Sequence, residues 1–164
     1  MLNAQSCNIM NTVSVESLEK SFDKFGKNVQ DTALKILKIL KQDDKIVEIY
    51  LVGNGKSREL NKKFRDKDKA TNILSFEEPA DFISPKVDYV QPKADFFSIK
   101  TKKRKLGEIY LNIRMTKDWA GKKNLFSADE LLAHGILHLL GYDHQKKGDR
   151  VKMENKELEI IKKI

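Results

Sequence analysis

The residues of this chain that could do chemistry lie in one short stretch, from position 134 to position 144. All three histidines of the 164-residue sequence occur there, as His134, His138 and His144. His134 and His138 are four residues apart, so on a helix they would lie one turn apart on the same face. Gly141 is the residue type that ends a helix in the left-handed conformation, and a turn there would let His144 approach the other two.

Three imidazoles that converge on one point, with no fourth protein ligand evident, are typical of a catalytic zinc site. In such sites three protein ligands hold the metal, and water takes the open fourth position. One buried histidine is more simply a hydrogen-bonded core residue, and a pair four residues apart is common by chance. The glycine and the third histidine favour the metal site, so we predict one metal ion bound by the three histidines.

The helix that would carry the first two histidines has sequence signals of its own. Ser127 is followed three residues later by Glu130, which is the pattern of a capping box at a helix N-terminus. Asp129 and Glu130 place negative charge in the first turn, where the helix dipole favours it. The residues that follow are apolar on nearly every side, so the sequence predicts a buried helix.

The spacing of the histidines and the glycine also matches the metzincin protease signature H-E-x-x-H-x-x-G-x-x-H. In those proteases the glutamate is the general base that acts on the metal-bound water. Gly135 occupies that position here, and a glycine cannot transfer a proton. The sequence therefore favours hydrolysis of something other than a peptide, and a metalloprotease stands as an alternative.

Composition restricts the class of protein and its partners. The formal net charge is +8 and the pI is near 9.4, which favours a nucleic acid partner first and an anionic membrane surface second. A generally lysine-rich proteome would give the same balance. The single Cys7 cannot form an internal disulfide, which fits a reducing compartment. No apolar run reaches membrane-spanning length and no signal peptide is evident, so we expect a cytoplasmic protein.

The remaining elements would hold the predicted metal helix in an α+β fold. Helices are expected at both ends and strands in the middle, which indicates one domain, residues 1–164, with a small mixed sheet of about four strands. In the first half of the chain we expect a loose tail or short strand over 1–13, a helix from Val15 to Leu40 that Gly26 divides or bends, a strand over 45–53, a helix capped by Ser57, and a strand over 71–76. In the second half we expect strands over 95–101 and 106–113, a short helix over 115–123 anchored by Trp119, and a helix over 148–164 with Val151, Leu158 and Ile161 inward.

Two basic segments could contact the phosphates of a nucleic acid. The helix capped by Ser57 would have a basic face, made of Arg58, Lys62, Lys63 and Arg65. Residues 102–105 would form a basic hairpin tip that either binds phosphates or keeps a sheet edge soluble. Arg65 can hold a phosphate oxygen through two parallel hydrogen bonds, or it can form a salt bridge with Asp68. We expect Arg65 and Lys67 to contact the substrate.

The stretch from 134 to 144 resembles the signature H-G-x-L-H-L-x-G-Y-D-H of the YbeY family of bacterial endoribonucleases. Residues 60–76 are similar to a second block of that family, L-N-x-x-[YF]-R-x-x-D-x-x-T-[DN]-V-L-S-F, and residues 106–109 to its L-G-[DE]-I strand. Met153, in the last expected helix, also fits the family pattern. The resemblance extends from about Ser57 to the C-terminus. Two features depart from the family pattern. Proline usually follows Ser75-Phe76 directly, whereas here Glu77-Glu78 intervene before Pro79. The segment 77–105 is also longer and more basic than the family pattern leads us to expect.

The resemblance implies a zincin-like α+β fold, one zinc ion per chain, and cleavage of single-stranded RNA. It carries His134, His138 and His144 over as metal ligands and Arg65 as the catalytic arginine. It also implies a role in 3′-end maturation of 16S ribosomal RNA and in ribosome quality control. The expected partners are therefore a 16S rRNA precursor and the ribosome or its small subunit, and we expect a monomer.

The general base of such a reaction stays open at the level of sequence. Asp143 lies beside a predicted ligand and could orient a histidine, or it could bond to amides of the turn. The ribose 2′-hydroxyl could instead be the nucleophile, and cleavage would then leave a 2′,3′-cyclic phosphate. A non-enzymatic ribosome-assembly factor with a structural zinc is the second alternative to the nuclease, beside the metalloprotease.

Overall fold

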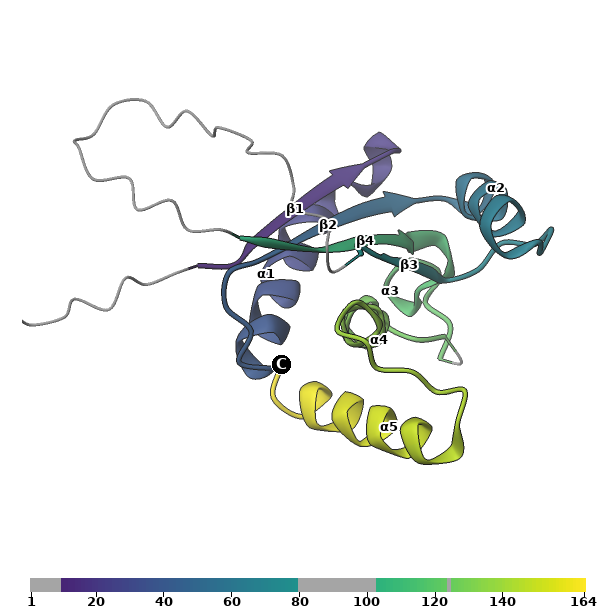
Figure 1. Cartoon of the computed structure of the whole chain (residues 1–164). Helices are drawn as coiled ribbons and strands as arrows, with labels where there is room; N and C mark the ends of the chain where they lie inside the picture. Colours follow the sequence, from purple (N-terminus) through teal and green to yellow (C-terminus); the bar gives the residue numbers. More distant parts are fainter. Residues whose placement is uncertain (1–9, 80–102, 124) are drawn as a thin grey trace, which may run out of the picture.

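A computed structural model describes residues 10–79, 103–123 and 125–164, which form an α+β fold around one four-stranded mixed sheet (Figure 1). The strands are β1 (Thr12–Ser17), β2 (Lys45–Val52), β3 (Ile73–Glu77) and β4 (Arg104–Asn112), and their order in the sheet is β1-β2-β4-β3. β1 and β4 run parallel to β2, whereas β3 runs antiparallel to β4 and forms an edge of the sheet. The predicted fold class and strand number are confirmed.

The helices cover one face of this sheet. They are α1 (Asp23–Ile39), α2 (Asn54–Arg65), α3 (Lys117–Ala120), α4 (Ala128–Leu139) and α5 (Lys147–Ile161), with short 3-10 helices η1 (Lys20–Phe22) and η2 (Ile113–Met115). Figure 1 shows α1 and α4 packed beneath the sheet and α5 beneath α4, while α2 projects beyond the end of the strands. In β2 and β4, buried Ile and Leu alternate with Glu and Tyr, so the apolar side of each strand packs against α1 and α4.

Helix α4 begins and ends where the sequence predicts. The Ser127 hydroxyl accepts from the Glu130 amide at 3.1 Å, and the Glu130 carboxylate accepts from the Ser127 amide at 2.6 Å, which completes the capping box. Gly141 follows the helix with a φ of 84°, and the Tyr142 amide donates to the Leu137 carbonyl at 3.0 Å. These contacts turn the chain back toward α4.

Gly135 allows α4 to pack unusually close to the sheet. A Cβ atom at this position would lie 2.8 Å from Cδ1 of Ile73 and 3.2 Å from Cδ1 of Ile109. The position equivalent to the metzincin glutamate therefore points into the core between β3 and β4. The absence of a side chain there serves packing, in addition to removing a base.

The N-terminal helix was predicted to start too early. Val15 belongs to β1, which pairs with β2 through residues 12–17 and 46–51, and α1 continues through Gly26 without a break. The error has a physical reason, since Val13 and Val15 alternate with polar residues as a strand requires. The spacing from Val15 to Leu18 and Phe22 happens to fit a helix as well.

The predicted cap of the second helix was also wrong. Helix α2 starts at Asn54 after Gly53, and Ser57 is buried inside it. The Ser57 hydroxyl donates to the Thr71 carbonyl at 2.6 Å and accepts from the Thr71 amide at 3.0 Å. Ser57 therefore ties the first turn of α2 to the segment that enters β3. The Asn61 side-chain amide, which donates to the Lys69 carbonyl at 2.8 Å, holds the later part of α2 to the same segment.

Three expectations for the second half of the chain need correction. Val151 and Leu158 are 50% and 58% exposed, and Met153 and Ile160 make the buried stripe of α5 instead. Arg104 and Lys105 lie in β4, paired with Lys45 and Ile46, so they form no hairpin tip.

The third correction concerns the bounds of the short helix predicted around Trp119 over residues 115–123. Helix α3 covers only Lys117–Ala120, although Trp119 does lie edge-on to Phe22, with ring centroids 5.4 Å apart. The predicted strand over 95–101, most of the predicted loop from 77 to 94, and Cys7 fall outside the described residues. None of the described helices has the length and apolar character needed to cross a membrane.

Candidate active site

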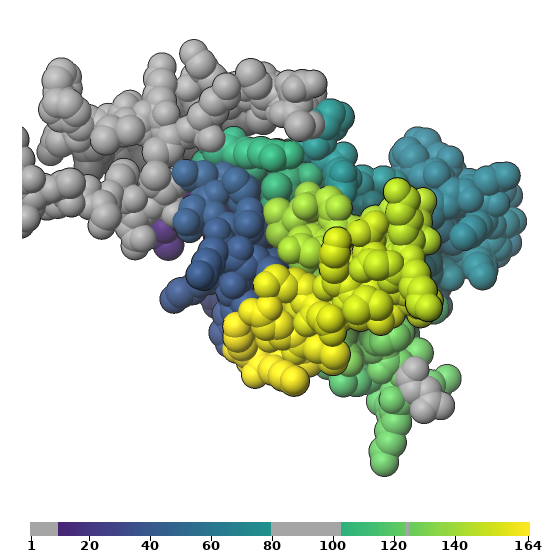
Figure 2. Space-filling view, turned by 60° about the horizontal axis from the view of Figure 1, so that its bottom comes forward, coloured from purple at the N-terminus to yellow at the C-terminus, as the bar shows by residue number. Residues whose placement is uncertain are grey.

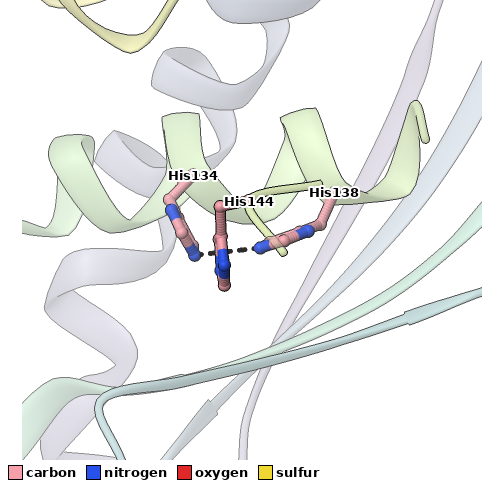
Figure 3. Close-up of side chains that lie close together, drawn as sticks. All are labelled: His134, His138 and His144. Atoms are coloured by element: carbon pink, nitrogen blue, oxygen red, sulfur yellow. Dashed lines mark hydrogen bonds between the residues drawn. The ribbon is translucent and has the colours of Figure 1, made fainter. Parts of the chain in front are cut away.

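The three histidines converge beside α4, as Figure 3 shows. His134 and His138 project from successive turns of α4, and His144 comes from the segment after Gly141. Each ring offers one nitrogen, and these three atoms all lie within 4.8 Å of one another. The structure therefore places the predicted trio where one metal ion could contact every ring.

The hydrogen bonds of two rings determine which nitrogen faces that point. His138 Nδ1 lies 2.9 Å from the Tyr142 carbonyl oxygen, and His134 Nδ1 lies 2.7 Å from the Glu157 carboxylate. Both oxygens can only accept, so we assign the proton of each ring to Nδ1. Each Nε2 is then left with a free lone pair, as a metal ligand requires.

The distance between the two Nε2 atoms fits a shared metal ion. They lie 3.1 Å apart, and two unprotonated nitrogens at that distance repel each other unless a cation lies between them. Tetrahedral zinc with bonds of about 2.05 Å would place two nitrogen ligands roughly 3.3 Å apart. Burial, and then the neighbouring His134 and His144, lower the pKa of His138, which favours the neutral ring that binds metals.

Glu157 is a site residue that the sequence reasoning missed. It lies on α5 between Met153 and Ile160, and the spacing of four and then three residues puts all three on the face that packs against α4. Its carboxylate therefore reaches the His134 ring. A glutamate on the buried stripe of an otherwise polar helix was the available signal. A carboxylate of this kind fixes the ring and makes it a stronger ligand.

Replacing Glu157 with glutamine should weaken metal binding by about 10-fold to 100-fold, because the amide keeps the shape but loses the charge that polarises His134. Competition with a chromogenic chelator for Zn²⁺ measures the affinity directly. Glu154→Gln is the matched control, since Glu154 is exposed on the same helix and pairs with Arg150. Equal affinities of the two variants would show that Glu157 does not tune the site.

A cavity of about 870 Å³ opens over the histidines. Arg65 and Lys67 line it at the end of α2, and Asn72, Ser75 and Glu77 line it along β3. Figure 2 shows the segment after α4 lying beside α2 on this face of the molecule. The structure thus brings the two predicted substrate-binding residues into the same cavity as the histidines.

The charges of Arg65 and Lys67 are available to an anion in this cavity. Asp68 is bound by Arg58 at 2.7 Å and by Lys62 at 3.2 Å, and these two cations lower the pKa of Asp68 to about 2. The expected alternative of an Arg65–Asp68 salt bridge is therefore not formed. Within the described part of the chain, neither Arg65 nor Lys67 makes an ion pair.

Among the described residues no strand covers the outer edge of β3, and this edge forms one wall of the cavity. The Asn112 amide donates to the Asn72 carbonyl at 2.9 Å and the Glu78 amide to the Leu106 carbonyl at 2.8 Å. Since alternate residues of an antiparallel strand bond to the partner, the backbone groups of residues 73, 75 and 77 point away from β4. These three residues line the cavity, so backbone donors and acceptors face the space beside the histidines.

Asp143 takes a local role in the turn. Its carboxylate accepts from the His144 amide at 2.7 Å, which corresponds to the simpler of the two roles expected for it. Among the described residues it makes no hydrogen bond to a histidine ring. Asp143 also lines the cavity, so it adds negative charge beside the site.

Comparison with known proteins gives a consistent result. The sequence matches the model of one protein family, described as "Endoribonuclease YbeY", over residues 8–164. Endoribonuclease YbeY of Wolbachia sp. subsp. Drosophila simulans is 34% identical over 155 residues, covering 91% of this chain and 93% of the relative. The protein of the same name from Colwellia psychrerythraea is 35% identical over 138 residues, covering 82% and 77% of the two chains. The family match includes β1 and α1, which precede the motifs that carry the sequence resemblance.

Proposed function

Because the chain belongs to the YbeY family of endoribonucleases, we propose that it is a zinc-dependent enzyme that cuts single-stranded RNA in the cavity above the three histidines. One observation carries this proposal. Two Nε2 lone pairs meet 3.1 Å apart in a cavity that also holds the free charges of Arg65 and Lys67. A ligand set for a Lewis acid beside a pair of cations suits a phosphodiester, because the cations can hold its negative charge while the metal polarises its P–O bonds.

The residues of the chain would divide the work as follows. His134, His138 and His144 hold the zinc ion, which when bound supplies Lewis-acid chemistry at the phosphate. Arg65 holds a non-bridging phosphate oxygen through its planar fork and offsets charge that develops there in the transition state. Lys67 attracts the neighbouring phosphate as a point charge.

The nucleophile can be identified from the substrate. A 2′-deoxy substitution at the cut site would abolish cleavage if the ribose 2′-hydroxyl attacks the phosphate, and the product of the normal RNA would then end in a 2′,3′-cyclic phosphate. Unchanged cleavage of the deoxy substrate would assign the attack to water. Asp143 holds the backbone amide of His144, and we propose that it positions this ligand through the turn and not through a ring nitrogen.

We further propose, from the family resemblance, that the cellular substrate is a 16S rRNA precursor cut at its 3′ end on the small ribosomal subunit. A cytoplasmic monomer acting in ribosome quality control accords with the net charge of +8 and with the lysine-rich helix α2. Mapping of 16S rRNA 3′ ends by adapter ligation and sequencing, in cells depleted of the protein, tests this part. Unaltered ends would remove the ribosomal assignment and leave the nuclease assignment intact.

Replacing Arg65 with alanine should lower kcat/KM for single-stranded RNA by about 100-fold or more, since a charged donor to the transition state is lost. Cleavage of a fluorescently labelled oligonucleotide provides the measurement, and the metal content should stay unchanged. Lys63→Ala is the control, because Lys63 is an exposed cation on the same helix outside the cavity. If both variants lost the same modest activity, Arg65 would be only part of the general positive charge.

A further inference from the structure

A second cavity, of about 780 Å³, lies on the other side of the histidines. It is bounded by α4, α5 and Phe126, the residue before the α4 cap. His134 and His144, together with Asn72 and Ile73 at the start of β3, line both cavities. The two cavities therefore adjoin at the metal ligands, so a strand bound at the histidines could place neighbouring groups in both.

The walls of the second cavity differ in chemistry from those of the first. They are mainly apolar, formed by Phe126, Leu131, Met153, Leu158 and Ile161. Phe126 and Leu158 are each 58% exposed, although large apolar side chains of a folded domain are usually buried. We call this site the Phe126–Leu158 pocket.

The charged groups of the Phe126–Leu158 pocket would repel a phosphate. Three carboxylates, those of Glu130, Glu154 and Glu157, line it, against the one guanidinium of Arg150. Arg150 donates to Glu154 at 2.8 Å, so these two charges compensate each other and the carboxylates of Glu130 and Glu157 keep the pocket negative. An uncharged planar group with N–H donors fits such walls, because its faces contact apolar side chains and its edge meets carboxylate acceptors.

We propose that the Phe126–Leu158 pocket binds the nucleobase next to the phosphate held at the metal centre. This inference rests on the proposed function and adds a subsite to it. Single-stranded RNA is commonly recognised by stacking of unpaired bases on aromatic rings and by hydrogen bonds to their edges. The Phe126 ring supplies the stacking surface, and Oε2 of Glu154, the carboxylate oxygen that Arg150 does not bind, accepts from base N–H groups.

Phe126 also has a structural role that the test must separate. It directly precedes Ser127, and residues at this position often pack against the fourth residue of the helix, here Leu131. Phe126→Leu retains an apolar side chain for this contact but removes the aromatic face. Leu158→Ala changes the opposite wall at an exposed position, where the fold depends little on the side chain.

The test combines pocket variants with RNA that lacks a base. One oligonucleotide lacks the base on the 5′ side of the cut, and another lacks the base on the 3′ side. For the one whose missing base would occupy the pocket, wild-type enzyme should have a kcat/KM roughly tenfold lower than for intact RNA. Phe126→Leu and Leu158→Ala should lower kcat/KM on the intact RNA and have no further effect on the abasic RNA. Val151→Ala is the control, since Val151 is 50% exposed on α5 and outside the pocket.

The outcomes are distinguishable. If wild-type enzyme cleaves no RNA, the proposed function fails. If it cleaves RNA but the pocket variants match Val151→Ala, or if they lower the rate equally on intact and abasic RNA, the base-binding pocket is overturned. The second of these results would indicate that the apolar walls contact something other than the base.

Discussion

His138→Ala should abolish metal binding and reduce RNA cleavage by roughly 10³-fold or more, while the protein stays folded. His138 provides one of three rings that meet at the site, and two rings alone leave the metal with too few protein ligands. The core does not depend on this ring, because His138 is only half-buried and lies outside the cluster of buried apolar side chains. Metal analysis should fall from one ion per chain to near zero.

Circular dichroism of the same variant separates a catalytic metal from a structural one. If the zinc ion is structural, both the His138→Ala variant and the chelator-treated wild-type protein should unfold. Gln145→Ala is the matched control, since Gln145 is exposed and lines the same cavity without a ring nitrogen. Retention of both metal and activity by His138→Ala would contradict the proposed ligand set.

Gly135→Glu, which restores the metzincin pattern, should destabilise the protein by about 3–5 kcal/mol and create no peptidase. Any side chain at position 135 meets Ile73 and Ile109, and a carboxylate there would be buried without a partner. The higher helix propensity of glutamate returns at most about 1 kcal/mol. Urea denaturation followed by circular dichroism gives the free energy of unfolding.

Gly55→Glu controls for the added charge and size. Gly55 lies in the first turn of α2, and a Cβ atom there meets nothing within 4 Å. Its variant should unfold at nearly the wild-type urea concentration. A stable Gly135→Glu protein that degraded unfolded polypeptides would revive the metalloprotease alternative and would show that position 135 faces the metal.

The metal helix could be predicted from the sequence because its signals are local. The capping residues, the apolar run, the two histidines and the terminating glycine all lie within 15 positions, from Ser127 to Gly141. The contacts that failed prediction join distant segments. Ser57 is hydrogen-bonded to the backbone of Thr71, and β1 is held as a strand by its pairing with β2. Such pairings override local preference and leave little trace in the neighbouring residues.

The residues that complete the site show the same limit. Glu157 reaches His134 across 23 positions, and only the packing of α5 on α4 brings them together. Arg65 and Lys67 were identified as substrate-binding residues through a motif. Their shared cavity with the histidines follows from the placement of α2 at the end of the sheet, which depends on the buried Ser57.

The edge of β3 that no strand of the described residues covers has a consequence for self-association. An open strand can pair with the same strand of another copy, and soluble proteins oppose this self-association with charged side chains near the edge. Arg65, Lys67 and Glu77 are all exposed around the cavity that β3 borders. The cations proposed to attract RNA would therefore also oppose pairing between copies, and neutralising Arg65 and Lys67 together would be expected to promote self-association as well as to weaken RNA binding.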